Sequence, residues 1–216
     1  MVAKLKVDQL ETVDGTGIIT ANNPLAGDGS SLTSLPAANV TGTHTSFTST
    51  GIDDNATSNA ITISADEEVT MPSQPCFMAR GSATNNNVTG NNTVWSVDFP
   101  TEIFDQGSNF ASDTFTASVT GKYLLLANLS FLGVSSPTGS RVTISTSNRD
   151  YYYDGSGDSY NAVSTVASYH FAVIADMDSG DTASVKGVGY GDGADIWDSH
   201  INGTGTTTHF AGVLLA

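Results

Sequence analysis

One short segment of the chain brings aromatic rings and carboxylates together. Aromatic faces stack on sugar rings and carboxylates accept hydrogen bonds from sugar hydroxyls, so this combination suits a saccharide-binding surface. Glycine and serine within residues 150–161 predict that the segment is a mobile loop. The alternative is that some of the tyrosines point inward at a strand end or pack against a neighbouring subunit. The candidate ligand-binding residues are Tyr151, Tyr152, Tyr153, Asp154, Asp158 and Tyr160.

A second segment, GDGADIWDSHING, surrounds Trp197 with acidic residues and makes this tryptophan the second candidate for ligand contact. Asp192, Asp195 and Asp198 could supply oxygen ligands to calcium, which accepts irregular loops. Their spacing is not that of an EF-hand, and acidic loops that face solvent are common in an acidic chain, so a solvated loop is the alternative. Calcium is the one cofactor that the sequence leaves open.

Other patterns do not form an enzyme site. The run from Gly187 to Gly191 superficially resembles a dinucleotide loop, but no helix-forming segment follows it. The acidic run from Asp66 to Glu68 has the character of a solvated turn. No histidine stands in a context that provides a nucleophile with a base. The sequence therefore predicts binding and no catalysis. The four histidines are His44, His170, His200 and His209.

The elements that must hold these segments are strands, and the clearest ones lie within residues 113–131. Phe115, Ala117 and Val119 fall at every second position, which is the period of a strand with one buried face. The run from Tyr123 to Phe131 begins with five consecutive apolar or aromatic residues, so both of its faces must be covered. A lone sandwich covers only one face, so more chain or another subunit must cover the other.

These residues resemble the jelly-roll trimers of the tumour-necrosis-factor superfamily, especially the globular heads of complement subcomponent q. The matching features are the alternating strand from Phe115, the corner Gly121-Lys122-Tyr123 and the apolar strand that follows it. The family's terminal strand pattern, S/T-x-F-x-G-x-L-L, matches Thr208–Leu215. The resemblance covers roughly residues 74–216. It implies an all-β jelly-roll β-sandwich head that assembles as a homotrimer.

Turn signals divide this head into short strands. Asp178-Ser179-Gly180-Asp181 is one such turn, and residues 83–92, 150–161 and 191–207 are expected to be loops. The expected strands lie near Cys76–Arg80, Thr93–Asp98, Phe110–Val119, Tyr123–Leu132, Arg141–Ser147, Ser164–Ala175, Thr182–Tyr190 and Thr208–Leu215.

The N-terminal residues 1–73 have a different character. Apolar residues are sparse among Gly, Ser, Thr, Asn and Asp, so a single copy would not offset its ordering entropy, whereas winding with two other copies would. Residues 27–42 resemble shaft and linker repeats of bacteriophage tail fibres and related virion appendages. Residues 59–75 predict a β pair, followed by prolines that end it. We expect an extended trimeric shaft that attaches to other virion proteins through its N-terminus.

Composition restricts the class of partner. Only 13% of the 216 residues are charged and 38% are apolar, which favours strands and turns over solvated helices. The formal charge of -15, with seven Lys and Arg, argues against nucleic acid and anionic membranes as ligands. No apolar run is long enough to insert into a membrane, and no secretory signal begins the chain, so synthesis in the host cytoplasm is expected. Cys76, the only cysteine, is either a small buried hydrophobe or an interchain or reactive thiol.

Together these patterns predict a bacteriophage fibre or receptor-binding protein that resides in the virion. It would attach to a host-surface saccharide or protein through many weak contacts. The alternatives are a capsid or baseplate decoration protein that binds no ligand, and a depolymerase.

Overall fold

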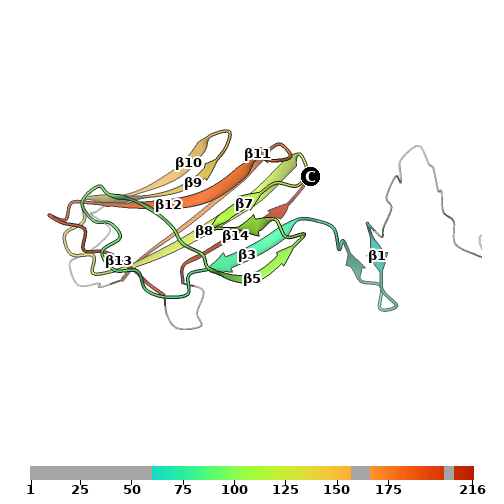
Figure 1. The fold of residues 1–216 in the computed structure, drawn as a ribbon, viewed down its shortest axis with the longest axis horizontal. Coiled ribbons are helices and arrows are strands. Elements are labelled where there is room, and N and C mark those ends of the chain that lie inside the picture. Colours follow the sequence, from blue (N-terminus) through green and yellow to red (C-terminus); the bar gives the residue numbers. More distant parts are fainter. Residues whose placement is uncertain (1–59, 157–165, 202–206) are drawn as a thin grey trace, which may run out of the picture. The chain divides into compact units, whose positions relative to one another are not determined.

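The fold is built from strands throughout the part of the chain that the structure describes. A computed structural model describes residues 60–156, 166–201 and 207–216. Its strands form two six-stranded antiparallel sheets, which share one core, and a separate two-stranded hairpin (Figure 1). These residues contain no helix, and hence none long and apolar enough to cross a membrane. The expectation of an all-β sandwich is confirmed for this part of the chain.

The first sheet, called the β9 sheet, has the strand order β10-β9-β12-β7-β6, and β4 pairs with β12 beside β7. Its strands are β4 (Val94–Ser96), β6 (Phe110–Ala111), β7 (Thr114–Thr116), β9 (Gly139–Thr146), β10 (Asp150–Ser156) and β12 (Thr182–Tyr190).

The second sheet, called the β8 sheet, has the strand order β11-β8-β14-β3-β5, and β13 also pairs with β8. Its strands are β3 (Cys76–Arg80), β5 (Thr101–Gln106), β8 (Gly121–Leu132), β11 (Val166–Met177), β13 (Asp198–Ser199) and β14 (His209–Leu214). The separate hairpin consists of β1 (Thr62–Ile63) and β2 (Val69–Thr70).

The connections between the sheets define the topology. The chain runs from β3 to β7, back to β8, across to β9 and β10, back to β11, across to β12 and back to β14. The first and last of these eight strands, β3 and β14, pair with each other at the centre of the β8 sheet. These eight strands, four from each sheet, are connected in the order of the double Greek key of a jelly roll. The expected jelly-roll topology is therefore present.

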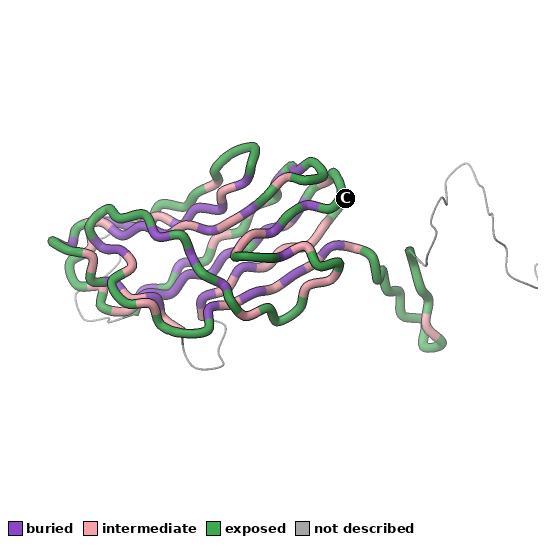
Figure 2. The backbone as a smooth tube through the Cα atoms, in the orientation of Figure 1, coloured by how far each residue is buried: buried purple, intermediate pink, exposed green. Residues whose placement is uncertain are grey.

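Alternate side chains of each sheet point into the shared core. Along β8 the odd-numbered residues from Tyr123 to Phe131 are buried, and buried residues alternate with more exposed ones along other strands (Figure 2). Phe77 of β3 stacks on Phe115 of β7 with ring centroids 4.6 Å apart, and Phe210 of β14 meets Phe77 edge-on at 5.0 Å. These aromatic contacts join the two sheets, as the period-two pattern predicts.

One predicted strand, Phe110–Val119, is interrupted in the structure. Ser112 and Asp113 adopt φ angles of 49° and 62° and turn the chain between β6 and β7. Ala117 is buried as predicted, but Val119 is 44% exposed. The expectation that Val119 faces the core is therefore wrong, because the chain has left β7 and is turning towards β8.

Two strands longer than two residues lie where no strand was predicted, and the two-residue β13 lies within the predicted loop 191–207. The predicted loop over residues 150–161 begins instead with β10, which pairs along its whole length with β9. β5 also escaped prediction, and most of its residues are exposed. Both strands lie at sheet edges, where one-sided burial is weak and leaves little period-two signal. The β pair expected near residues 59–75 is confirmed by β1 and β2.

Candidate ligand-binding face

The outer face of the β9 sheet carries a row of polar and charged side chains. Asp154 of β10 lies beside Arg141 of β9, which lies beside Val188 of β12. Because side chains alternate between the two faces of a strand, residues two apart on each strand share this face. The neighbouring row consists of Tyr152, Thr143 and Lys186.

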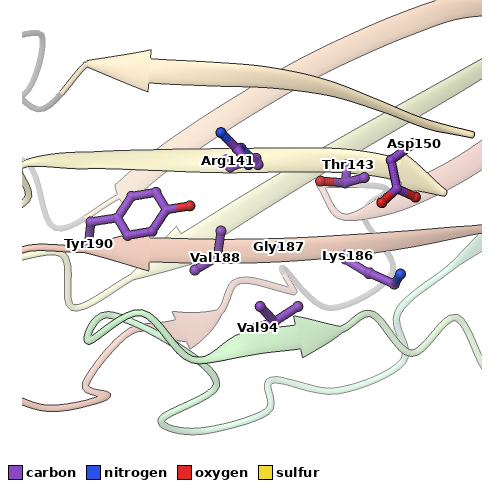
Figure 3. A pocket seen from close by; sticks show the side chains of 8 residues that line it. All are labelled: Val94, Arg141, Thr143, Asp150, Lys186, Gly187, Val188 and Tyr190. Atoms are coloured by element: carbon purple, nitrogen blue, oxygen red, sulfur yellow. The ribbon is translucent and has the colours of Figure 1, made fainter.

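A hollow of about 260 Å³ lies on this face. Figure 3 shows its lining on neighbouring strands, with Tyr190 and Lys186 at opposite ends of the β12 portion. Pockets for drug-sized ligands usually measure about 300–1,000 Å³, so the hollow has room for one small chemical group and not for an extended ligand. Its lining residues are Val94, Arg141, Thr143, Asp150, Lys186, Gly187, Val188 and Tyr190.

Arg141 is held in place from two sides. Its Nε and Nη2 donate to the two carboxylate oxygens of Asp154 at 2.6 and 3.0 Å, which is a bidentate pair. Its guanidinium carbon lies 4.3 Å from the centroid of the Tyr152 ring. The hydrogen bond with Asp154 raises the pKa of Arg141, and the same bond lowers the pKa of Asp154. Arg141 therefore fixes the outer edge of β10 and supports the exposed Tyr152 ring.

A second polar group lies at the other end of the hollow. The Lys186 Nζ donates to the Ser145 hydroxyl at 3.1 Å, and this hydroxyl donates to the Asp150 carboxylate at 2.5 Å. The face thus holds two cations, Arg141 and Lys186, against two carboxylates, Asp150 and Asp154. A charge-balanced surface with donors, acceptors and an exposed aromatic ring can bind a neutral ligand that is rich in hydroxyl groups.

The tyrosine run predicted as one ligand-binding loop divides between the two faces of β10. Tyr152 points outward with Asp154 and is 56% exposed. Tyr151 lies on the opposite face and packs against the core, as the alternative interpretation allowed. Tyr153 shares that inner face but is 48% exposed, because β10 is an edge strand. The other two candidates, Asp158 and Tyr160, lie outside the described residues.

Trp197 is buried in the core and does not form an exposed ligand contact. Its ring lies 5.6 Å from that of Phe131, and a Cβ added to Gly189 would come within 2.5 Å of it, so only glycine fits beneath this ring. The indole N–H donates to the Asp192 carboxylate at 2.5 Å. Asp192 also accepts from the backbone N–H of Ser136 at 2.9 Å. The expectation of an exposed Trp197 is wrong because the loop folds back over the end of the sandwich.

The other two acidic candidates for calcium fasten one loop to another. Asp195 accepts from the backbone N–H of Asn91 at 2.9 Å and from the hydroxyl of Thr93. Asp198 accepts from the backbone N–H of Asn87 at 2.7 Å. Each carboxylate, like that of Asp192, thus has partners from the protein itself. Among the described residues, no three His, Cys, Asp or Glu side chains come together in a way that could hold a metal ion.

Comparisons with known proteins bear on the sandwich. No protein-family model and no curated protein matches the chain. Several solved structures are similar to it. The globular domain of zebrafish complement 1qA protein is similar over 66% of this chain and 98% of its own, with 15% identity and a TM-score of 0.45. Murine APRIL, in crystals at pH 8.5 and pH 5.0, covers 66% of this chain and 99% of its own, with 16% and 17% identity and TM-scores of 0.45.

Sequence reasoning missed much of the hollow. Arg141 lies on β9, and Lys186 and Tyr190 lie four residues apart on β12. Both strands were predicted, and all three residues face away from the core. Polar residues at every second position of these two strands are the signal that could have identified the outward face. Pairing β9 with β12 and β10 is what brings the residues together, and the sequence does not reveal that pairing.

Part of the outer face of the β8 sheet is apolar, and the row next to this part is polar, with His170, Asn128, His209 and Arg80 side by side. The strand registers place apolar side chains side by side in two rows. Leu126 is 37% exposed, Phe104 49% and Ile174 60%. The expectation that residues 123–127 place apolar side chains on both faces is confirmed, whereas Lys122, Asn128 and Ser130 of the same strand are polar. This apolar band consists of Ala172, Leu126, Ala211, Met78 and Phe104 in one row and Ile174, Leu124, Val213 and Cys76 in the next.

Proposed function

We propose that the chain is a bacteriophage fibre or receptor-binding protein whose sandwich attaches to the host surface as a homotrimer. In this proposal residues 1–73 form the attachment and shaft region, most of which lies outside the described residues, and residues 74–216 form the head. The observation that carries the proposal is the opposite chemistry of the two outer sheet faces. One carries the apolar band, and the other carries the charge-balanced hollow beside Tyr152.

The apolar band is the surface that two other copies of the chain would cover. Burying apolar surface contributes about 25 cal/mol per Å², so covering side chains such as Leu126 and Ile174 contributes several kcal/mol per subunit. A closed three-fold ring lets each copy cover another without leaving an open end. The band lies on the β8 sheet, so assembly through it would leave the hollow of the β9 sheet exposed.

The hollow is the surface that would meet the host, as saccharide or protein. It has room for one sugar ring, with Arg141, Lys186 and Asp150 as hydrogen-bonding groups. Tyr152, which contacts the lining residue Arg141 from outside the hollow, would offer a stacking face. One such contact is weak. Three equivalent hollows on a trimer, and several fibres on a particle, would add their affinities through avidity.

The test compares two adjacent tyrosines in the intact chain. Tyr152→Ala removes the ring that stacks on Arg141, whereas Tyr153→Ala removes an equally large, similarly exposed ring from the opposite face of β10. Each stacking contact contributes about 0.5–1.5 kcal/mol and is repeated around the trimer, so Tyr152→Ala should lower whole-cell binding tenfold or more. Tyr153→Ala should bind like the wild type. Equal losses in both variants would contradict the assignment of the outer face.

A decoration protein without a ligand is the second candidate, and the small volume of the hollow favours it. Binding of fluorescently labelled wild-type protein to host cells separates the two functions. A trimer that shows no saturable binding to host envelopes, yet raises the thermal stability of the particle, would support decoration. Release of reducing ends from host polysaccharide would instead identify a depolymerase.

A further inference from the structure

The β1–β2 hairpin has an apolar face that the other described residues leave largely exposed. Ile63 lies opposite Val69 in the ladder, and Ile61 and Met71 continue the same face two residues further along. Their exposed fractions are 62% for Ile61, 70% for Ile63, 62% for Val69 and 49% for Met71. The opposite face carries Thr62 and Thr70. The hairpin is thus amphipathic, with its apolar side in solvent.

Local hydrogen bonds define the hairpin without giving it a core. The Ser64 N–H donates to the Glu68 carbonyl at 2.9 Å, and the Ser64 hydroxyl accepts from the N–H groups of Asp66 and Glu68. Every residue from Ala60 to Ser73 is exposed except Ser64, which is half-buried. An isolated two-stranded hairpin is marginal in water, so an amphipathic one requires a surface to pack against.

The apolar face of the hairpin is continuous with the apolar band. A hollow of about 390 Å³ joins Ile61 and Met71 to Val119, Leu214 and Leu215 at the base of the sandwich. A second hollow, of about 450 Å³, is lined by Met71 together with Cys76 and Val213, which belong to the band. The surface that the trimer would bury therefore reaches the hairpin, with Gln74 and Gln106 as polar residues among the apolar lining.

The chemistry of the hairpin restricts its partner. The turn between its strands carries Asp66, Glu67 and Glu68, which disfavours nucleic acid and anionic membranes. The chain enters the hairpin from residues 1–59 and leaves it for β3, so three copies that share one axis in both shaft and head must also pass this point together. The surface nearest to each hairpin is then the same hairpin of another copy.

We propose that the β1–β2 hairpins of three chains pack their apolar faces together and form a collar at the base of the head. This inference rests on the trimer of the proposed function. Ile63 and Val69 face the three-fold axis and the neighbouring copies, whereas Thr62 and Thr70 face solvent. The acidic turns extend away from the contact, where water screens their mutual repulsion.

The collar can be tested by cross-linking in the full chain. Cys76→Ser removes the only native thiol, and Ile63→Cys or Thr62→Cys then places one thiol on either face of the hairpin. A short bismaleimide should link the Ile63→Cys chains into covalent pairs, up to about two thirds of all chains, because the third thiol of each trimer has no free partner. Thr62→Cys, one residue away, should give at least tenfold fewer pairs.

Light scattering on the same samples separates failure of the collar from failure of the trimer. A trimeric protein in which Ile63→Cys cross-links no better than Thr62→Cys would overturn the collar and leave the trimer intact. It would mean that residues 1–59 or another partner cover the hairpin. A monomer at micromolar concentration would overturn both. As a second measurement, the double variant Ile63→Asn, Val69→Asn should raise the protein concentration at which the trimer dissociates at least tenfold. The double variant Thr62→Asn, Thr70→Asn should leave that concentration unchanged.

Discussion

The outer faces of the two sheets have the same backbone geometry and opposite chemistry. On β8 the outward positions include Leu124 and Leu126, and on β9 they include Arg141 and Thr143. Inward residues of both strands, such as Leu125 of β8 and Ile144 of β9, contribute to one core. The core therefore depends on one half of each strand's residues, whereas the other half sets the chemistry of the outer face. Under the proposed function, this second half decides which face would meet a subunit and which would meet a ligand.

The largest effect is expected when a charge is placed on the apolar band. Leu126→Glu would bury a carboxylate at each of three subunit contacts, and an unpaired buried charge costs several kcal/mol. The trimer should dissociate to monomers at micromolar concentration. Val94→Glu makes the same kind of change at a 60% exposed position on the β9 sheet and should leave the trimer intact. Size-exclusion chromatography with light scattering measures both, and a trimeric Leu126→Glu protein would place the interface elsewhere.

An intermediate effect, on the free energy of unfolding and not on assembly, is expected from changes in the acidic loop around Trp197. Asp192→Ala leaves the buried Trp197 N–H without its acceptor and should lower the free energy of unfolding by about 1–3 kcal/mol. Asp195→Ala, at a half-buried carboxylate, should lower it less. Calorimetry in calcium and in chelator should give the same melting temperature, because the carboxylates already have protein partners. A melting temperature that rises when calcium is added would instead indicate that the acidic loop binds calcium.

The smallest effect is expected from the ion pair on the ligand-binding face. Arg141 holds the pKa of Asp154 below its ordinary value of 3.8, so the pair stabilises the fold above pH 3.8 and is lost as pH falls through the lower pKa of the folded state. Both side chains are more than one third exposed, so the contribution is small. The difference in melting temperature between wild type and Asp154→Asn should be slight at pH 7 and should vanish near pH 2. A difference that grows in acid would contradict this assignment.

The sequence predicts the core better than the site, for a physical reason. Period-two burial is a local signal, so β3 and β12 were predicted with the bounds that the structure gives them. The hollow depends on which strands are neighbours, and β4, β9 and β12 are far apart in sequence. Trp197 was misplaced because its acidic neighbours look solvated, whereas Asp192 is buried with it as its hydrogen-bond acceptor.

Edge strands account for the other errors. Asp150 and Gly155 look like turn residues, yet both pair with β9 within β10. An edge strand has a partner on one side only, so polar residues and glycine cost little there. For the same reason Tyr152 belongs to a strand and is nevertheless 56% exposed. The sequence prediction placed an exposed tyrosine in a loop and gave a tyrosine on a strand a buried position.

Because both tryptophans are buried, tryptophan fluorescence can report on folding separately from binding at the hollow. Trp95 and Trp197 are the only two indoles in the chain, and both lie in the core, where neither lines the hollow. Their fluorescence should be blue-shifted in the folded protein and should move to the red when the sandwich unfolds. A ligand that stacks on Tyr152 should leave this emission maximum unchanged. The emission spectrum can therefore identify variants that lose binding because they lose their fold, without any added label.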